Sequence, residues 1–218
     1  MNYFAHGRTF LNDPYFLAGT AVPDWLNVVA RRVKVRTKHA LPFVDDRDRQ
    51  LAAVAQGIVR HHADDKWFHE TRAFSELSWQ FTARIRDCLP ADDGLRPSFL
   101  GHILVEILLD ACLTADDPSR LEAYYQALAE VDPEVVERAV GRMATGRPEG
   151  LGTFVTLFLQ ERFLWDYADD GKLCYRLNQV LRRVELPPIA DCLGDVLPDL
   201  RRSVAGRKAE LLTSHPKP

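Results

Sequence analysis

Three ionisable side chains, His102, Glu106 and Asp110, recur at every fourth position within the apolar segment SFLGHILVEILLDACL, residues 98–113. The apolar residues surround the segment on all sides, which is typical of a buried helix. Residues four apart lie on one side of a helix, so the three side chains form a stripe. A buried acid without a partner is costly, and such an acid is usually protonated, ion-paired or bound to a metal. The stripe therefore indicates a candidate metal site.

A second stripe of the same spacing lies in GIVRHHADDKWFHETRAF, residues 57–74. The apolar face of this predicted helix is formed by Leu51, Val54 and Ile58. Continuing that face predicts that His61, Asp65 and His69 point toward the core. The neighbouring His62 and Asp64 point elsewhere, because one residue turns a helix by about 100°. We expect these two to be solvated or to contact the ligands without binding the ion themselves.

Helix geometry limits what each stripe can bind. Its outer members lie about 12 Å apart, so no single ion can hold all three. Two adjacent members can bind one ion, or a stripe can span two ions about 3.5–4 Å apart. Imidazole and carboxylate ligands without thiolate favour zinc, manganese or iron. In a hydrolase, His69 or His102 would then protonate the leaving group or orient the nucleophile.

The same residues allow readings without a metal. The acids of the stripes could form a buried ion-pair network with Arg60 or Arg72, and a single buried histidine usually bonds to a backbone carbonyl. A basic run contains Arg31, Arg32, Lys34, Arg36, Lys38 and His39. Such a run is normally a solvated surface, and the functional alternative is a dock for an acidic partner.

Composition and periodicity favour one all-α domain over residues 1–218, with the candidate site in residues 1–115 and a helical C-terminal half in residues 116–212. The formal net charge of -3 gives no sign of a nucleic-acid partner. We see no signal peptide and expect no membrane-spanning window, so we expect a cytoplasmic protein. The four cysteines show no C-x-x-C pattern, which argues against a zinc knuckle or a disulfide framework. The oligomeric state is left open.

Helix signals predict the approximate positions of the elements. We expect a first helix over residues 3–11, a second from Pro23, a basic loop over residues 34–43, and one long helix from Asp45 past Phe81. A turn is expected at residues 89–97 and a frayed tail at residues 213–218. We also expect a continuous helix over residues 152–170.

The N-terminal motif MNYFAH, followed by LAGTAVPDW, resembles the opening of the acyl carrier protein phosphodiesterase family. GIVRHHADDKWFH is similar to a later histidine and aspartate segment of that family, and ILVEILLDACL is similar to its paired-acid helix. The resemblance implies an HD-like helical bundle and manganese-dependent hydrolysis of the phosphodiester that joins phosphopantetheine to an acidic carrier protein. It places six residues at the metal site: His6, Asp24, His61, Asp65, Glu106 and Asp110.

The chain also departs from this pattern. Thr20 stands at the position of an asparagine, Phe68-His69 at that of a Thr-Asp pair, and Ala111 at that of a histidine. The likeness covers the first half of the chain. The motifs are also similar to the helical zinc-dependent phospholipase C group. The sequence also allows a nucleotide phosphohydrolase on the same scaffold, or a non-catalytic helical protein that binds a metal or a partner. The metal prediction holds for either hydrolase family, whereas the substrate differs.

Overall fold

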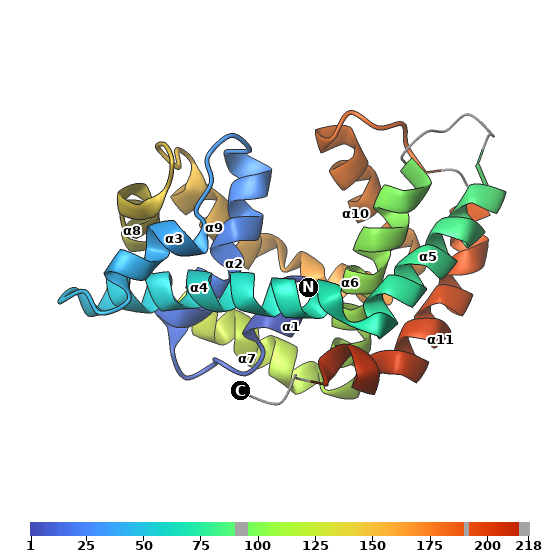
Figure 1. Cartoon of the computed structure of the whole chain (residues 1–218), viewed down its shortest axis with the longest axis horizontal. Helices are drawn as coiled ribbons and strands as arrows, with labels where there is room; N and C mark the ends of the chain where they lie inside the picture. Colours follow the sequence, from blue (N-terminus) through green and yellow to red (C-terminus); the bar gives the residue numbers. More distant parts are fainter. Residues whose placement is uncertain (90–95, 190–191, 214–218) are drawn as a thin grey trace. The chain divides into compact units, whose positions relative to one another are not determined.

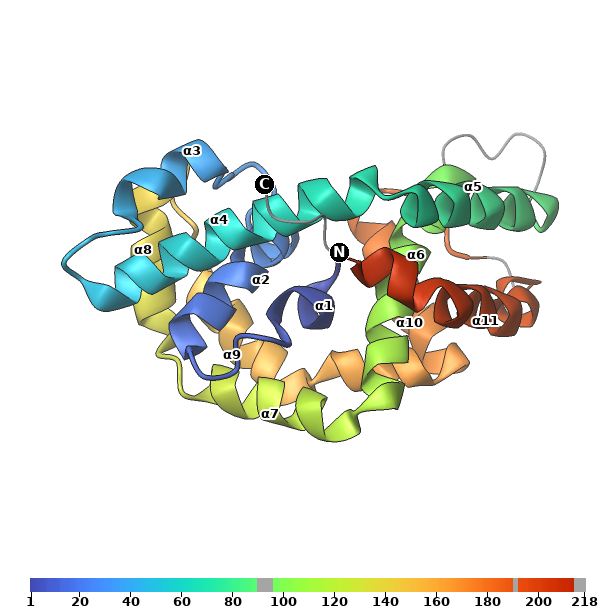
Figure 2. The ribbon, with the colours of Figure 1, turned by 60° about the horizontal axis from the view of Figure 1, so that its bottom comes forward.

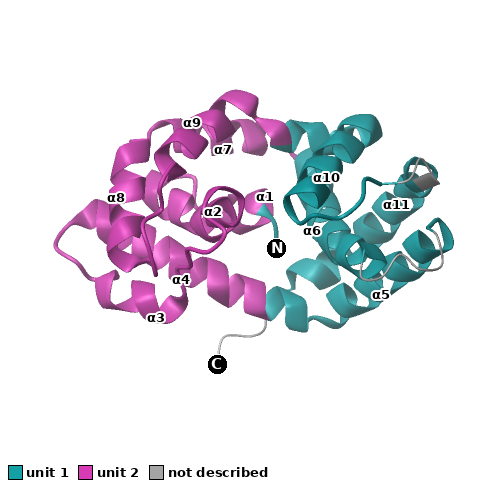
Figure 3. Ribbon diagram, turned by 90° about the horizontal axis from the view of Figure 1, so that it is seen from above, with its two compact units in different colours: residues 1–2, 67–116, 164–218 teal, residues 3–66, 117–163 magenta. Residues whose placement is uncertain are grey.

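The computed structural model of the chain is all-α, and it describes residues 1–89, 96–189 and 192–213, in which every regular element is a helix (Figure 1). The expected turn at residues 89–97 and tail at residues 213–218 fall mostly outside the described residues. The chain divides into two compact units, which are described separately (Figure 3). Each unit takes segments from both predicted halves of the chain. The sequential division at residue 115 therefore does not coincide with the boundary between the units.

Unit 2 comprises residues 3–66 and 117–163. Its elements are α1 (Tyr3–Gly7), α2 (Pro14–Val29), α3 (Thr37–Ala40), the 3-10 helix η1 (Leu41–Phe43), most of α4 (Arg49–Glu70), α7 (Pro118–Ala129), α8 (Pro133–Met143) and α9 (Leu151–Glu161). The short α1 packs against α2 and α7, and Figure 2 shows it between α4 and α7. Aromatic residues fill the core beside it: Phe4, Trp25, Tyr124 and Phe158 are fully buried. Tyr124 is thus a core residue.

Unit 1 comprises residues 1–2, 67–116 and 164–218. Its elements are the end of α4, α5 (Arg72–Asp87), α6 (Arg96–Asp116), most of the 3-10 helix η2 (Phe163–Ala168), α10 (Asp170–Arg183) and α11 (Cys192–Leu212). Helices α5, α6 and α11 pack against one another. The contact of α5 with α6 is close at Gly101, where a Cβ atom would lie 2.4 Å from Thr82 Oγ1.

The helix boundaries correct three predictions. Helix α2 begins at Pro14 and not at Pro23, because Asp13 caps it by accepting a hydrogen bond from Phe16 N at 3.1 Å. The predicted basic loop contains α3 and η1. The long helix expected from Asp45 is two helices, because Thr71 has an extended backbone and its side chain caps α5.

Two further predictions about the helices were wrong. Residues 152–170 form α9 and η2 in place of one helix, because Arg162 adopts a left-handed conformation with φ of 47° at the C-terminus of α9. Helix α6 is long and apolar enough to cross a membrane, although no such window was expected. The folded chain buries 61% of this apolar window. Mostly buried core helices of soluble proteins meet the same criteria of length and composition.

Candidate metal site in unit 2

Three residues from three helices of unit 2 converge. His6 lies on α1, Asp24 on α2 and His61 on α4. Each offers one ligand atom, and these atoms all lie within 4.8 Å of one another. His6 and His61 are buried, with 1% and 5% of their surface exposed, whereas Asp24 is half-buried. Two imidazoles and one carboxylate form a donor set that suits zinc or manganese.

The close approach of α2 and α4 positions His61. At Gly57 an added Cβ atom would lie 2.1 Å from Phe16 O and 2.8 Å from Gly19 Cα, so the two helix backbones touch where they cross. Only glycine permits this distance. One turn beyond the crossing, His61 Nδ1 lies 2.8 Å from the carbonyl oxygen of Thr20. With Nδ1–H donating to that oxygen, His61 Nε2 carries the lone pair, which is how metal-binding histidines are commonly oriented.

His6 is a buried histidine without a hydrogen-bond partner among the described residues. Neither of its ring nitrogens has a partner within hydrogen-bonding distance. The Asp64 carboxylate oxygen Oδ2 is 3.9 Å from His6 Nδ1, and Arg60 holds that carboxylate at 2.8 Å. The His6 ring stacks on the His61 ring with 4.2 Å between the centroids. Since an unpartnered buried polar group is destabilising, the ring is well placed to bind a ligand.

Burial favours the neutral form of both imidazoles. Desolvation lowers the pKa of His6 more than the Asp64 carboxylate raises it. Desolvation also holds the pKa of His61 well below its ordinary value, and the neighbouring imidazoles of His6 and His62 lower it further. Neutral imidazole is the form that binds a metal ion, because a protonated ring has no lone pair to donate.

A cavity of about 250 Å³ opens beside this group. Asp24 and His61 lie on its wall together with His62 and Asp65, and Lys34 and Arg36 also line it. His62 Nε2 is fixed at 2.8 Å from the carbonyl oxygen of Val35. The remaining lining residues are Pro23, Leu26, Asn27, Val33 and Val35. Acids and imidazoles thus share one cavity with two cationic side chains.

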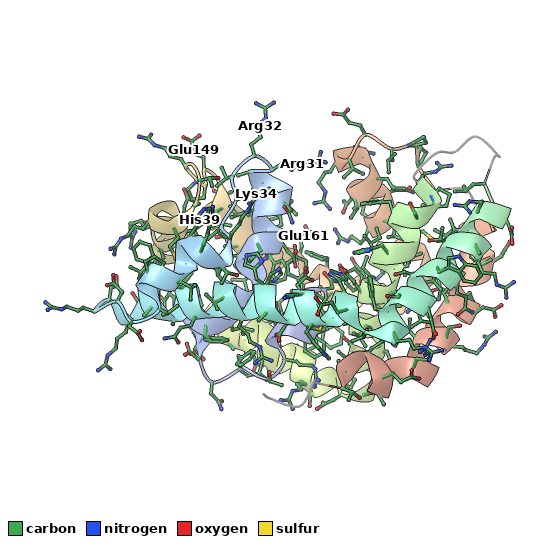
Figure 4. All side chains as sticks on the ribbon, in the orientation of Figure 1. Arg31, Arg32, Lys34, His39, Glu149 and Glu161 are labelled. Carbon is green, nitrogen blue, oxygen red and sulfur yellow. The ribbon has the colours of Figure 1, made fainter. Side chains whose placement is uncertain are left out.

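The cationic side of the cavity is built by the segment after α2. Lys34 donates its backbone N–H to Thr145 Oγ1 at 2.9 Å, and Thr145 N donates to Lys34 O at 2.9 Å. The Lys34 ammonium group donates to Asn27 Oδ1 at 2.7 Å. Figure 4 shows Arg31, Arg32 and Lys34 together on this segment. The predicted basic run is solvent-exposed at five of its six positions: Arg31, Arg32, Lys34, Arg36 and Lys38.

The buried imidazoles predict that the metal-free chain becomes less stable below about pH 6.5. The unfolded chain takes up protons near the ordinary histidine pKa of 6.5, whereas His6 and His61 resist protonation in the folded chain. The unfolded state then binds more protons, so the free energy of unfolding falls as the pH falls. Urea unfolding in a chelator between pH 7 and 5 should show this decrease.

A His61→Gln variant should lose part of that pH dependence, while the control His39→Gln should retain it. The window avoids the contributions of Asp64 and Glu106, because their pKa values lie below their ordinary values of 3.8 and 4.5. Their stabilising effect is fully present above those values and is lost only at lower pH. Equal slopes for wild type and His61→Gln would contradict the assignment.

A second group of possible ligands lies in unit 1. His69 Nε2 is 2.8 Å and His102 Nε2 is 3.2 Å from the same oxygen, Glu106 Oε1. The amino nitrogen of Met1 is 3.7 Å from this oxygen. Desolvation raises the pKa of Glu106, but the amino group and the hydrogen bonds from His102 and His69 lower it more, so the carboxylate is ionised well below its ordinary pKa. His69, His102 and Glu106 therefore also form a group of three possible ligands.

The six predicted metal ligands are divided between the two units. Unit 2 contains His6, Asp24, His61 and Asp65, and unit 1 contains Glu106 and Asp110. Asp65 lines the cavity, and Asp110 is buried with 1% of its surface exposed. Whether all six surround common ions stays a prediction. Solvent exposure decreases along the stripe on α6: His102 is exposed, Glu106 is half-buried and Asp110 is buried.

Two residues that the sequence analysis left outside the ligand set lie near the site in unit 2. Asp64, expected to be solvated or to contact the ligands, is buried beside His6, with 8% of its surface exposed. His62 lines the cavity. The arginines of the ion-pair alternative have different partners: Arg60 pairs with Asp64 and Arg72 with Glu76.

Searches for similar proteins found no matching family model, curated sequence or solved structure.

Proposed function

We propose that the chain is a metal-dependent phosphodiester hydrolase whose active site is the cavity of unit 2. The observation that carries this proposal is the buried His6 ring, whose nitrogens have no hydrogen-bond partner among the described residues and which lies beside possible ligands on Asp24 and His61. Lys34 and Arg36 on the cavity wall favour an anionic substrate. The resemblance of the N-terminal motifs to a phosphodiesterase family supports the same reaction.

The residues fit a divalent ion of the zinc or manganese class. His6 and His61 would supply neutral imidazole nitrogens, and Asp24 would supply a carboxylate oxygen. The hydrogen bond of His61 to Thr20 O would orient its ligand nitrogen. A divalent ion in such a site supplies positive charge for a phosphoryl oxygen and lowers the pKa of water.

The remaining polar residues of the cavity receive distinct roles. Asp65 accepts the proton of the attacking water, because it lines the same cavity as Asp24 and His61. His62 is the remaining imidazole on this wall and protonates the leaving alkoxide. Lys34 and Arg36 bind the phosphoryl oxygens and keep the diester oriented. The sequence predicts that His69 or His102 supplies this proton. That assignment stays a prediction, because both residues belong to unit 1 and the cavity belongs to unit 2.

The substrate we favour is a phosphodiester on an acidic protein. A cavity of about 250 Å³ is smaller than most sites for whole ligands, so the rest of the substrate would lie outside it. The exposed basic run beside the cavity offers a surface for acidic residues of a partner. A carrier protein with its phosphopantetheine arm meets both conditions. We also propose a cytoplasmic location, in keeping with this substrate.

The test is turnover of bis(p-nitrophenyl) phosphate and of a phosphopantetheinylated carrier protein by the full chain. We expect hydrolysis with added manganese or zinc and none in a chelator. The double variant Lys34→Ala/Arg36→Ala should raise KM for the carrier protein about tenfold and change kcat less, because these cations act in binding.

The matched control is Arg138→Ala/Arg142→Ala, which removes two exposed cations of α8. It should leave KM unchanged. A chain that binds metal but hydrolyses neither substrate would contradict the proposed reaction. Hydrolysis of the small diester alone would retain the reaction and exclude the carrier protein as substrate.

A further inference from the structure

None of His69, His102 and Glu106 of unit 1 is among the residues proposed to bind the metal ion of unit 2. His69 lies near the end of α4, and His102 and Glu106 lie one turn apart on α6. We infer that the group is a second metal site, in which two histidines and one glutamate bind a zinc ion and leave one coordination position open to solvent. This inference is independent of the proposed hydrolase activity.

The distances within the group are close to those that a zinc site requires. With bonds of about 2.0–2.1 Å, neighbouring ligand atoms of a tetrahedral zinc ion lie roughly 3.3 Å apart. Here Glu106 Oε1 lies 2.8 Å from His69 Nε2 and 3.2 Å from His102 Nε2. All three ligand atoms lie within 4.8 Å of one another. An ion can therefore enter with small side-chain adjustments.

Neighbouring residues hold the two histidines in place. The Phe74 ring contacts both imidazoles, with 4.6 Å between its centroid and that of His69 and 4.9 Å to that of His102. The two imidazole centroids are themselves 4.8 Å apart. Gly101, next to His102, lets α6 pack closely against α5, because a side chain at this position would clash with α5. Such packing reduces the conformational entropy that metal binding would cost.

Charge and exposure suit a site with an open position. Glu106 Oε1 lies within 3.2 Å of both imidazoles, and a glutamate carboxylate is an anionic ligand that suits a divalent cation. The His102 side chain is 47% exposed and that of His69 is 29% exposed, so water reaches the group. Zinc sites with three protein ligands of this kind commonly bind water or substrate as the fourth ligand.

The experiment is a zinc titration of the full, chelator-stripped chain by isothermal calorimetry. The chain should begin at Met1 without an added tag, because the Met1 amino nitrogen lies 3.7 Å from Glu106 Oε1. Wild type should bind two zinc ions. His102→Gln and Glu106→Gln should each lower the affinity for one of these ions by more than about 100-fold, since even the loss of an outer-shell partner lowers metal affinity by about 10–100-fold. The exposed Glu70→Gln serves as the control and should bind both.

A His61→Ala variant separates this site from the one in unit 2. It should lose the unit 2 ion and retain the ion that depends on His102. In that variant, zinc should shift the ring nitrogen NMR signals of His69 and His102 through coordination at Nε2. If His102→Gln and Glu106→Gln both keep the full zinc stoichiometry and affinity, the second site is overturned. Circular dichroism should confirm that His61→Ala is folded. Unshifted ring nitrogen signals of His69 and His102 in the folded, zinc-loaded variant would also overturn the second site.

Discussion

Asp65→Asn is expected to lower kcat for phosphodiester hydrolysis by on the order of 10³-fold, which is within the range for loss of a general base. The amide has almost the same shape as the carboxylate, so the cavity wall that Asp65 helps to form is retained. It cannot accept a proton from water at neutral pH, and it is a weaker ligand should the carboxylate also bind the ion. The measurement is kcat at saturating metal and substrate.

The control for this prediction is Asp45→Asn, which changes an exposed acid before α4. Both variants should give the far-UV circular dichroism and thermal unfolding curve of the wild type. Turnover by Asp65→Asn at the wild-type rate would remove Asp65 from the catalytic residues. Loss of bound metal together with turnover would instead identify Asp65 as a ligand.

Gly57→Ala is expected to lower the free energy of unfolding by on the order of 3 kcal/mol, as for overpacking of a tightly packed contact. The new methyl group would lie 2.1 Å from Phe16 O and 2.8 Å from Gly19 Cα, and neither backbone atom can move without shifting α2. Alanine favours a helix over glycine by about 1 kcal/mol, so the steric effect must exceed this gain. Urea unfolding at pH 7.5 measures the difference.

The matched control is Gly206→Ala in α11, where an added Cβ atom meets nothing within 4 Å. This change should stabilise the chain by up to about 1 kcal/mol. Gly57→Ala should also weaken metal binding at His6, Asp24 and His61, because a displaced α2 moves Thr20 O away from His61. If Gly57→Ala were as stable as Gly206→Ala, the two helix backbones would not touch at their crossing.

The buried face of α4 could be predicted because its period is a local property. Leu51, Val54 and Ile58 are buried, and His61 continues their face as expected. The burial of Asp64 could not be predicted from the period of the apolar residues, because that period assumes that only one face of the helix is covered. Residues of both α1 and α2 reach α4 here, and His6 of α1 lies near the side to which Asp64 points.

The meeting of His6, Asp24 and His61 depends on the tertiary fold. Neither spacing nor composition connects residues that are 18 and 37 positions apart, and only the family resemblance had placed them at one site. The start of α2 was different, because the signal was present in the sequence. Asp13 followed by Pro14 is a common helix start, and it outweighs Pro23, which the helix accommodates in its interior.

The atom that orients His61 belongs to the main chain of Thr20 and not to its side chain. The Thr20 hydroxyl is used elsewhere, since it donates to Leu17 O at 2.7 Å. An exchange of side chain at this position therefore leaves the acceptor in place as long as the helix persists. The threonine that stands where the resembling family has asparagine is thus compatible with an unchanged imidazole orientation.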